Sequence, residues 1–132
     1  MAEIHLGELR KALELARSSR SSVWPAVSHV FERIAGEIGQ SPEFARAFLS
    51  PFLADKRVRW SLERALCEGQ QIGRELVKAG QKRGEIDAKL DSKNVALLLH
   101  QAFLGTLLLW SLRGSPNLEL AVRTAFRQLA EL

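Results

Sequence analysis

Residues 95–112 read VALLLHQAFLGTLLLWSL, and this stretch decides the fold. No charged residue interrupts it, and leucine, alanine, valine or an aromatic residue fills most positions. A helix that covers a soluble core needs only one apolar stripe. A helix that is apolar on nearly every side therefore needs cover on its second face. That cover is a lipid membrane, the interior of the chain itself, or a second protein surface.

The rest of the 132-residue chain also has a helical pattern. Apolar residues recur every three or four positions, while glycine, proline and β-branched residues are sparse. This spacing predicts an all-α protein of six helices without a strand. The expected helices cover about residues 3–18, 22–38, 42–49, 55–83, 92–113 and 117–132.

Helix-start and helix-stop signals set these boundaries. Ser41-Pro42-Glu43 combines a hydroxyl cap, a proline at the first helical position and an acid near the positive end of the helix dipole. Pro51 is expected to end that helix early, because proline disfavours helical backbone at the preceding residue. The remaining signals are Gly84 as a left-handed cap, Asp91 as an N-cap, Gly114 as a stop and Ser115-Pro116 as a start.

Composition predicts one domain over residues 1–132. Hydrophobic residues make up 46% of the chain, and its single cysteine allows no internal disulfide, which favours a cytoplasmic location. The net charge is +4, but arginines alternate with glutamates, as on a solvated helical surface. Direct nucleic-acid binding through the basic clusters at 56–59 and 78–83 is the alternative function.

The cover of residues 95–112 is expected to be a second copy of the chain. His100, Gln101 and Thr106 lie near the middle of the stretch and argue against a membrane. The last expected helix has one polar stripe of Glu119, Arg123, Arg127 and Glu131, spaced to pair along the helix, and is otherwise mostly apolar. Two neighbouring helices too apolar for a monomer surface predict a homodimer whose interface is a four-helix bundle. A fully interior helix is the alternative.

The expected interface consists of small residues that allow close helix approach and of larger aliphatic residues beside them. They are Ala102, Gly105, Leu109, Leu118, Ala121, Val122, Ala125 and Leu129.

Two stretches of the chain resemble TetR-family transcriptional regulators. The first is GQKRGEIDAKLDSKNVALLLHQAFLGTLLLWSL at 80–112, with Gly84, Asp91, Gly105 and Trp110 at family-like spacing. The second is SPEFARAFLSPFLADKRVRWSLERA at 41–65, which looks like the short middle helix of the family running into its long helix. The resemblance covers nearly the whole chain.

The resemblance implies the helical body of such a regulator, which binds a small, largely apolar effector and dimerises through its last two helices. In the family, effector binding in the body changes DNA binding by an N-terminal three-helix head. This sequence starts where the body would start, so DNA contact is expected only through a head outside it. The stretch IAGEIGQSP at 34–42 looks like a helix-turn-helix turn, but the next helix is rich in phenylalanine and suits a core better than a DNA groove.

An effector pocket is expected among the second, fourth and fifth helices, with apolar walls and few polar groups. The candidate ligand-binding residues are Phe31, Trp60, Cys67, His100, Phe103 and Trp110. His100 needs a hydrogen-bond partner inside its leucine-rich helix, and that partner is an effector, a residue across the dimer or a nearby backbone carbonyl. The sequence shows no catalytic motif, no histidines at metal-binding spacing and no cofactor motif, so we expect no enzyme, metal or cofactor.

Overall fold

The computed structural model describes residues 2–18, 22–113 and 117–131. Within these ranges the chain forms six helices and no strand, which confirms the all-α prediction. The helices are α1 (Ala2–Ser18), α2 (Val23–Ile38), α3 (Pro42–Ala54), α4 (Lys56–Lys82), α5 (Ser92–Arg113) and α6 (Leu118–Glu131). Gly114 and Ser115-Pro116, expected to separate the last two helices, lie outside the described residues.

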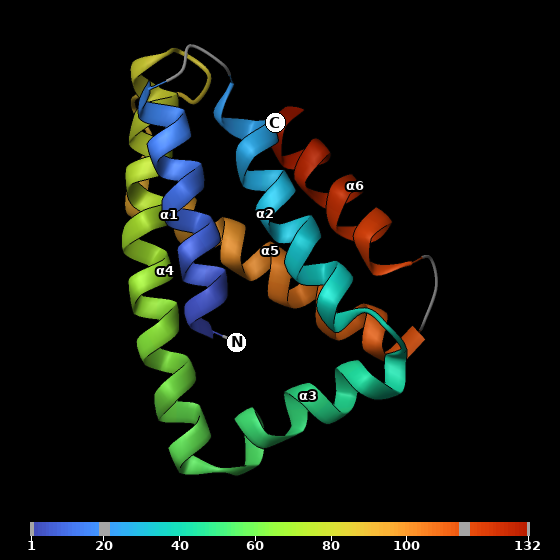
Figure 1. Cartoon of the computed structure of the whole chain (residues 1–132). Helices are drawn as coiled ribbons and strands as arrows, with labels where there is room; N and C mark the ends of the chain where they lie inside the picture. The colour runs from blue at the N-terminus through green and yellow to red at the C-terminus, as the bar shows by residue number, and fades with distance from the viewer. Residues whose placement is uncertain (1, 19–21, 114–116, 132) are drawn as a thin grey trace.

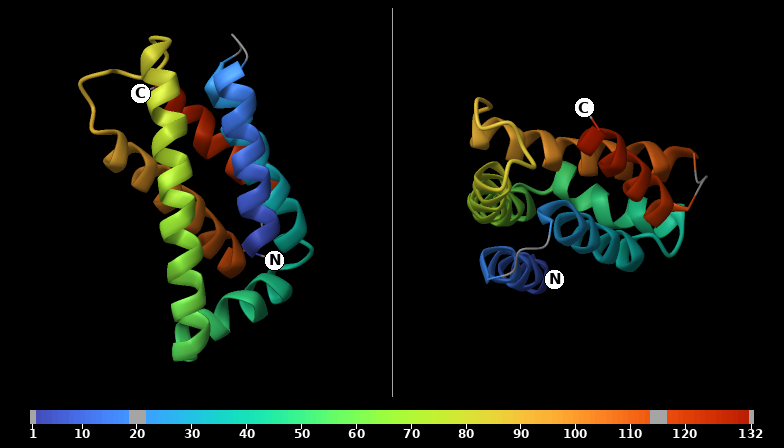
Figure 2. Two further views of the ribbon diagram at one scale, coloured as in Figure 1. Left: turned by 60° about the vertical axis from the view of Figure 1, so that its left-hand side comes forward. Right: turned by 90° about the horizontal axis from the view of Figure 1, so that it is seen from above.

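The helices form a bundle that is closed at one end by α3 (Figure 1). α1 and α4 lie side by side and run in the same direction, while α2 packs against α6. α5 lies behind them in this view and contacts α4, α3 and α6. Seen from above, α1 is on one outer side of the bundle and α5 is on the opposite side (Figure 2). Each of these two helices therefore has one face turned away from the bundle.

Most predicted helix signals form the expected backbone contacts. The Ser41 hydroxyl accepts from the Phe44 amide at 3.0 Å, and the Asp91 carboxylate accepts from the Lys93 amide at 2.8 Å. Gly84 has a φ of +76°, the left-handed conformation that glycine adopts without steric cost. At the start of α6, the Asn117 side chain accepts from the Leu120 amide at 2.8 Å. These bonds satisfy backbone groups that a helix end leaves free.

The prediction that α3 ends before Pro51 is wrong. α3 continues to Ala54, and the Asp55 amide still donates to the Pro51 carbonyl at 2.9 Å. A proline removes its own donor but keeps its carbonyl, so the next turn can form. Asp55 then ends α3 and starts α4, where its carboxylate accepts from the Arg57 amide at 2.8 Å.

The core is built around Phe31 of α2. Its ring is stacked on Phe126 of α6, with centroids 4.9 Å apart, and lies 4.9 Å from the ring of Phe103 of α5. The inner side of α6 packs into the same core, because Leu118 is 2% exposed and Val122 is fully buried. The two were predicted as dimer contacts. This prediction is corrected, since the protomer itself buries both side chains.

α1 packs against α4 and α2. Among its side chains at positions 7–15 and 17, only Leu9 and Ala12 are buried. Exposed ion pairs also join α1 to α4: Arg10–Glu68 at 3.3 Å and Arg17–Glu75 at 3.1 Å. A surface ion pair contributes roughly 0–1 kcal/mol, whereas burying a leucine contributes about 2 kcal/mol. Leu9 is thus the largest buried side chain among those described on α1, and the partly buried Leu13 also packs against the core.

Among the described residues, α5 is the one helix long and apolar enough to cross a membrane, judged by length and composition alone. About a third (33%) of its most apolar stretch is buried within the protein. The helix is therefore partly a core helix, but a large apolar surface remains uncovered. The alternative of a fully interior α5 is excluded by this exposure.

Candidate functional site

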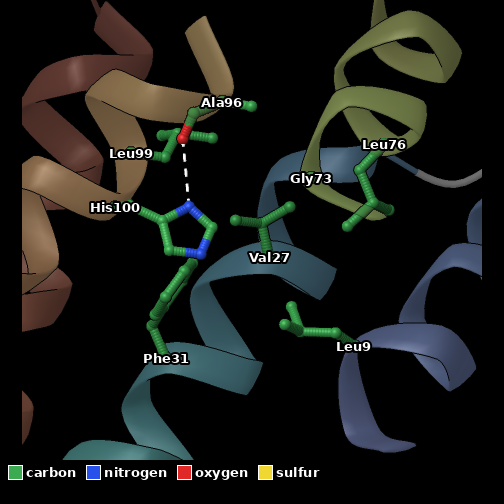
Figure 3. Close-up of a pocket in the computed structure, with 8 residues that line it drawn as sticks. All are labelled: Leu9, Val27, Phe31, Gly73, Leu76, Ala96, Leu99 and His100. Atoms are coloured by element: carbon green, nitrogen blue, oxygen red, sulfur yellow. Dashed lines mark hydrogen bonds between the residues drawn. The ribbon is translucent and has the colours of Figure 1, made fainter. Parts of the chain in front are cut away.

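Four helices meet around a small cavity next to His100 (Figure 3). We call it the His100 cavity, and its lining residues are Leu9 of α1, Val27 and Phe31 of α2, Gly73 and Leu76 of α4, and Ala96, Leu99 and His100 of α5. Seven of these eight residues are uncharged and carry no polar side-chain atom. The imidazole of His100 is therefore the one polar side chain in the wall that the structure describes.

The hydrogen bonding of His100 fixes the role of each ring nitrogen. Nδ1 donates to the carbonyl oxygen of Ala96, one turn earlier in α5, at 3.1 Å. A carbonyl can only accept, so Nδ1 carries the hydrogen, and Nε2 of the neutral ring is an acceptor. Figure 3 shows Nε2 on the opposite side of the ring, facing α2. Nε2 forms no hydrogen bond with a described residue.

Burial favours the neutral form of this histidine. It lowers the pKa of His100 below its ordinary value of 6.5, and the hydrogen bond to Ala96 offsets this only in part. The ring of Phe31 stands edge-on to the imidazole, with centroids 5.8 Å apart and an interplanar angle of 88°. The imidazole is thus neutral, and the surface that lines the cavity is apolar throughout.

Glycine brings α4 close to α5 at this point. A Cβ atom at Gly73 would lie 3.4 Å from the Cβ of Ala96 and 3.8 Å from Cε1 of His100. Our sequence reasoning did not include Gly73 in the site. The available signal was Gly69-x-x-x-Gly73, a spacing that places two small residues on one helix face and allows a neighbouring helix to approach.

The His100 cavity is small in this arrangement of the helices. Its free volume is about 10 Å³, roughly the space of one water molecule. Pockets for drug-sized ligands measure about 300–1,000 Å³. A larger molecule can therefore enter only if a wall moves.

The structure brings together only some of the predicted ligand-binding residues. Phe31 and His100 line the cavity, and Phe103 packs against Phe31. Trp60 and Cys67 lie elsewhere, on the exposed side of α4, where the Arg64 guanidinium is 5.0 Å from the Trp60 ring centroid. They are too far towards the start of α4 to join Gly73 in the wall. Trp110 is buried and does not line the cavity, and its Nε1 has no hydrogen-bond partner among the described residues.

A second feature is the outward side of α5, which we call the outer leucine face. It consists of six exposed leucines: Leu97, Leu98, Leu104, Leu108, Leu109 and Leu112. No charged residue lies between Lys93 and Arg113, so the face is uncharged along most of the helix. Gly105 lies among these leucines, and a Cβ added there would meet no atom within 4 Å. The face is therefore open on the protomer.

The edges of α6 have different surroundings. On one edge, Arg123 pairs with Glu32 of α2, and Glu119 lies over Gly36 of α2. Helical periodicity places the half-buried Ala121 and Ala125 on the other edge, the side of α5. These alanines and Ala102 of α5 are half-buried, so each keeps part of its apolar surface exposed on the protomer. Leu129 instead packs against the core.

Comparison of the chain with protein-family models, curated proteins and solved structures gives no match. The function must therefore be inferred from the His100 cavity and the outer leucine face. Among the described residues, no group of three or more histidine, cysteine, aspartate or glutamate side chains is placed to hold a metal ion.

Proposed function

We propose that this chain is the effector-binding and dimerisation body of a TetR-like transcriptional regulator. In this proposal the last two helices pair with those of a second copy, and a small apolar effector binds in the His100 cavity. Effector binding would then control operator binding by an attached DNA-binding head. The observation that carries the proposal is the outer leucine face, six exposed leucines on one side of α5.

The inner side of α5 favours a protein partner over lipid. Leu99, Phe103 and Leu107 on this side are buried in the core. A membrane-spanning α5 would have to leave the bundle and expose this core to water. A second copy covers only the outer side, so the fold of each protomer is kept.

The size of the surface indicates that α6 also contributes. α5 has 22 residues, so it is roughly 33 Å long and about 10 Å across, a footprint of about 330 Å². A stable protein interface needs about 800 Å² on each partner. On α6, Ala121 and Ala125 are half-buried and Leu120 is exposed, so this helix also has apolar surface that a second helix pair can contact. Two helices from each copy then give the four-helix arrangement of a closed, two-fold dimer.

Analytical ultracentrifugation tests the dimer. The parent protein is expected to sediment as a dimer at micromolar concentration, and Leu108→Glu as a monomer, because the substitution puts a charge at the centre of the outer leucine face. Leu53→Glu is the matched control, since Leu53 is 74% exposed on α3, away from that face. A parent protein that stays monomeric would contradict the proposal.

A reporter assay tests the regulatory part. The chain is fused to a DNA-binding head that occupies its operator only as a dimer. Repression by the fusion, its loss in Leu108→Glu and its release by a small apolar molecule are expected. Repression that no effector releases would leave a dimerisation module without the sensing function.

Direct nucleic-acid binding is the second candidate. It is favoured by the exposed cluster Lys56, Arg57 and Arg59 beside Trp60, which is 59% exposed. Basic side chains contact phosphates and an exposed indole can stack on a base. Retardation of DNA at low salt that decreases steeply as salt increases would support this candidate, and no retardation at low salt would remove it.

A further inference from the structure

We infer that Gln101 sets the register of the dimer. The two α5 helices cross at this residue in antiparallel directions, and its side-chain amide forms two reciprocal hydrogen bonds with the amide of the partner's Gln101. The inference rests on the proposed function, because it specifies how two copies meet at the outer leucine face. It is carried by one polar side chain that lies within that face and has no partner among the described residues.

Gln101 differs from the other polar side chains in the apolar stretch of α5. His100 Nδ1 and Thr106 Oγ1 each donate to a carbonyl oxygen one turn earlier in the helix, at 3.1 and 2.6 Å. Ser111 Oγ donates to the Leu108 carbonyl at 2.7 Å. Gln101 is exposed, and its amide forms no hydrogen bond with a described residue. Its donor and its acceptor are therefore available to another chain.

Gln101 lies among the exposed leucines of α5. Helical spacings of four, three and seven residues place Leu97, Leu104 and Leu108 on the same side of the helix as Gln101. A partner that covers these leucines also covers the amide. A buried amide without a hydrogen-bond partner is costly, so the partner must offer a donor and an acceptor at this point. Lipid tails offer neither.

A second copy of the chain offers both groups. An amide has an acceptor oxygen and a donor nitrogen, so two amides related by a two-fold axis can each donate to the other. The face also has no charged residue between Lys93 and Arg113. An identical copy therefore brings no like charge to it, although the chain has a net charge of +4. This composition is suited to contact between identical surfaces.

An antiparallel crossing at Gln101 also matches the side chains on either side of it. Residues equally far before and after Gln101 then meet, so Leu98 faces the partner's Leu104 and Leu97 faces the partner's Gly105. A Cβ atom at Gly105 would meet no atom within 4 Å, so the glycine leaves room for a leucine. Antiparallel helices also bring opposite ends of their dipoles together.

Other registers leave the amide without a partner. A register that pairs Gln101 with the partner's Leu108, for example, sets the amide against an apolar side chain. A polar residue in an apolar helix interface is known to select one register in this way, at some cost in stability. Gln101 is therefore a specificity-determining residue of the interface and not a source of its affinity.

Cysteine cross-linking tests the register directly. The variants carry Cys67→Ser, which removes the single, exposed cysteine of the chain. Gln101→Cys should form a disulfide-linked dimer on oxidation with diamide, because facing Cα atoms lie within the roughly 7 Å that a disulfide can span. Leu108→Cys is the matched control on the same exposed side. Its two copies would lie roughly 21 Å apart along antiparallel helices, so it should not cross-link.

A charge exchange at the same position is the second test. Gln101→Glu and Gln101→Lys each place two like charges together in a homodimer, so the dissociation constant from sedimentation should increase at least about tenfold. An equimolar mixture of the two variants should dimerise again, because opposite charges then meet. Gln40→Glu and Gln40→Lys change an exposed glutamine outside α5 and should dimerise like the parent protein.

The outcomes separate this inference from the proposed function. A parent protein that sediments as a dimer, while Gln101→Cys does not cross-link, contradicts the register and leaves the dimerisation part of the proposed function. Cross-linking of Leu108→Cys as efficient as that of Gln101→Cys would indicate parallel helices and overturn the inference. A mixture of the two charge variants that stays monomeric would overturn it as well. A monomeric parent protein contradicts both proposals.

Discussion

Arg123 of α6 donates two hydrogen bonds to Glu32 of α2, from Nε to Oε1 and from Nη2 to Oε2, each 3.3 Å long. The sequence instead predicted that Arg123 would pair along its own helix, within the stripe of Glu119, Arg127 and Glu131. The stripe is polar as expected, but Arg123 and Glu119 contact α2. The pair therefore ties the last helix to the second, 91 positions earlier in the chain.

The Glu32–Arg123 pair is expected to stabilise the fold mainly above pH 4.5. Partial burial opposes ionisation of Glu32, but hydrogen bonds from Arg123 and Ser28 outweigh it and hold the pKa of this carboxyl below its ordinary value of 4.5. The stabilisation is thus present above the unfolded pKa and is lost as the pH falls through the folded pKa. In urea unfolding, Glu32→Gln should show a small loss of stability at pH 7 and less pH dependence below 4.5. Glu131→Gln, an exposed carboxylate on α6, should behave like the parent protein.

His100 is expected to add a pH dependence in a higher range. Its folded pKa is lowered by burial, so the unfolded chain, with a value of 6.5, takes up the proton first as the pH decreases. The free energy of unfolding should therefore decrease as the pH falls from 6.5 through the folded pKa. Unfolding curves between pH 7.5 and 5 should show this decrease in the free energy of unfolding in the parent protein and in His29→Leu. A similar slope in His100→Leu would assign the effect to another group.

Gly73→Ala is expected to stabilise the protein and to weaken ligand binding. Alanine is better than glycine inside a helix by roughly 0.5–1 kcal/mol, and the new Cβ makes an ordinary contact with Ala96 at 3.4 Å. The methyl group would also occupy space beside His100. Thermal unfolding measures the first effect, and titration with a small apolar effector of the parent protein measures the second.

Gly80→Ala is the matched comparison on the same helix. Its Cβ would lie 2.9 Å from Cδ1 of Ile86, so that side chain must shift. We expect a smaller gain or a loss in the free energy of unfolding, and unchanged binding of the same effector. Equal changes in stability and ligand binding in Gly73→Ala and Gly80→Ala would argue that the position of Gly73 in the cavity wall does not affect binding.

Leu118→Ala is expected to destabilise each protomer. Leu118 is 2% exposed, and truncation of a buried leucine typically costs about 2–5 kcal/mol. Leu109→Ala changes an exposed side chain and should leave the stability of the monomer within about 0.5 kcal/mol. Urea unfolding at low protein concentration measures both. If Leu118→Ala left the stability of the protomer unchanged, Leu118 would be assigned to the dimer interface instead of the core.

Gly105→Phe is expected to weaken self-association without weakening the protomer. A Cβ atom at this position meets no atom of the protomer within 4 Å, and a phenylalanine ring would separate two helices that approach at Gly105. The dimer dissociation constant from sedimentation should increase, while circular dichroism should show the helix content of the parent protein. An unchanged dissociation constant would place the dimer contact elsewhere on α5.

Much of the fold followed from local signals. The Ser41 and Asp91 caps depend on residues within one turn, so sequence spacing was sufficient to locate them. The end of α3 was predicted wrongly because proline disfavours helical backbone at the residue before it. In the structure, the next turn of α3 forms nevertheless, with a hydrogen bond to the Pro51 carbonyl. The site was predicted less completely. Phe31 and His100 were named, but Leu9 and Gly73 reach the cavity only through the packing of α1 and α4.

The sequence by itself determined six helices, most of their ends and the excess of apolar surface on the last two. Only the tertiary structure decided which side of α5 is buried and which side carries the outer leucine face, and that Leu118 and Val122 point inwards. The physical reason is that a helix with leucines on every side has no apolar periodicity to mark its inner face. Its orientation is set by contacts with α3, α4 and α6 and by Phe31 of α2, which come from distant parts of the chain.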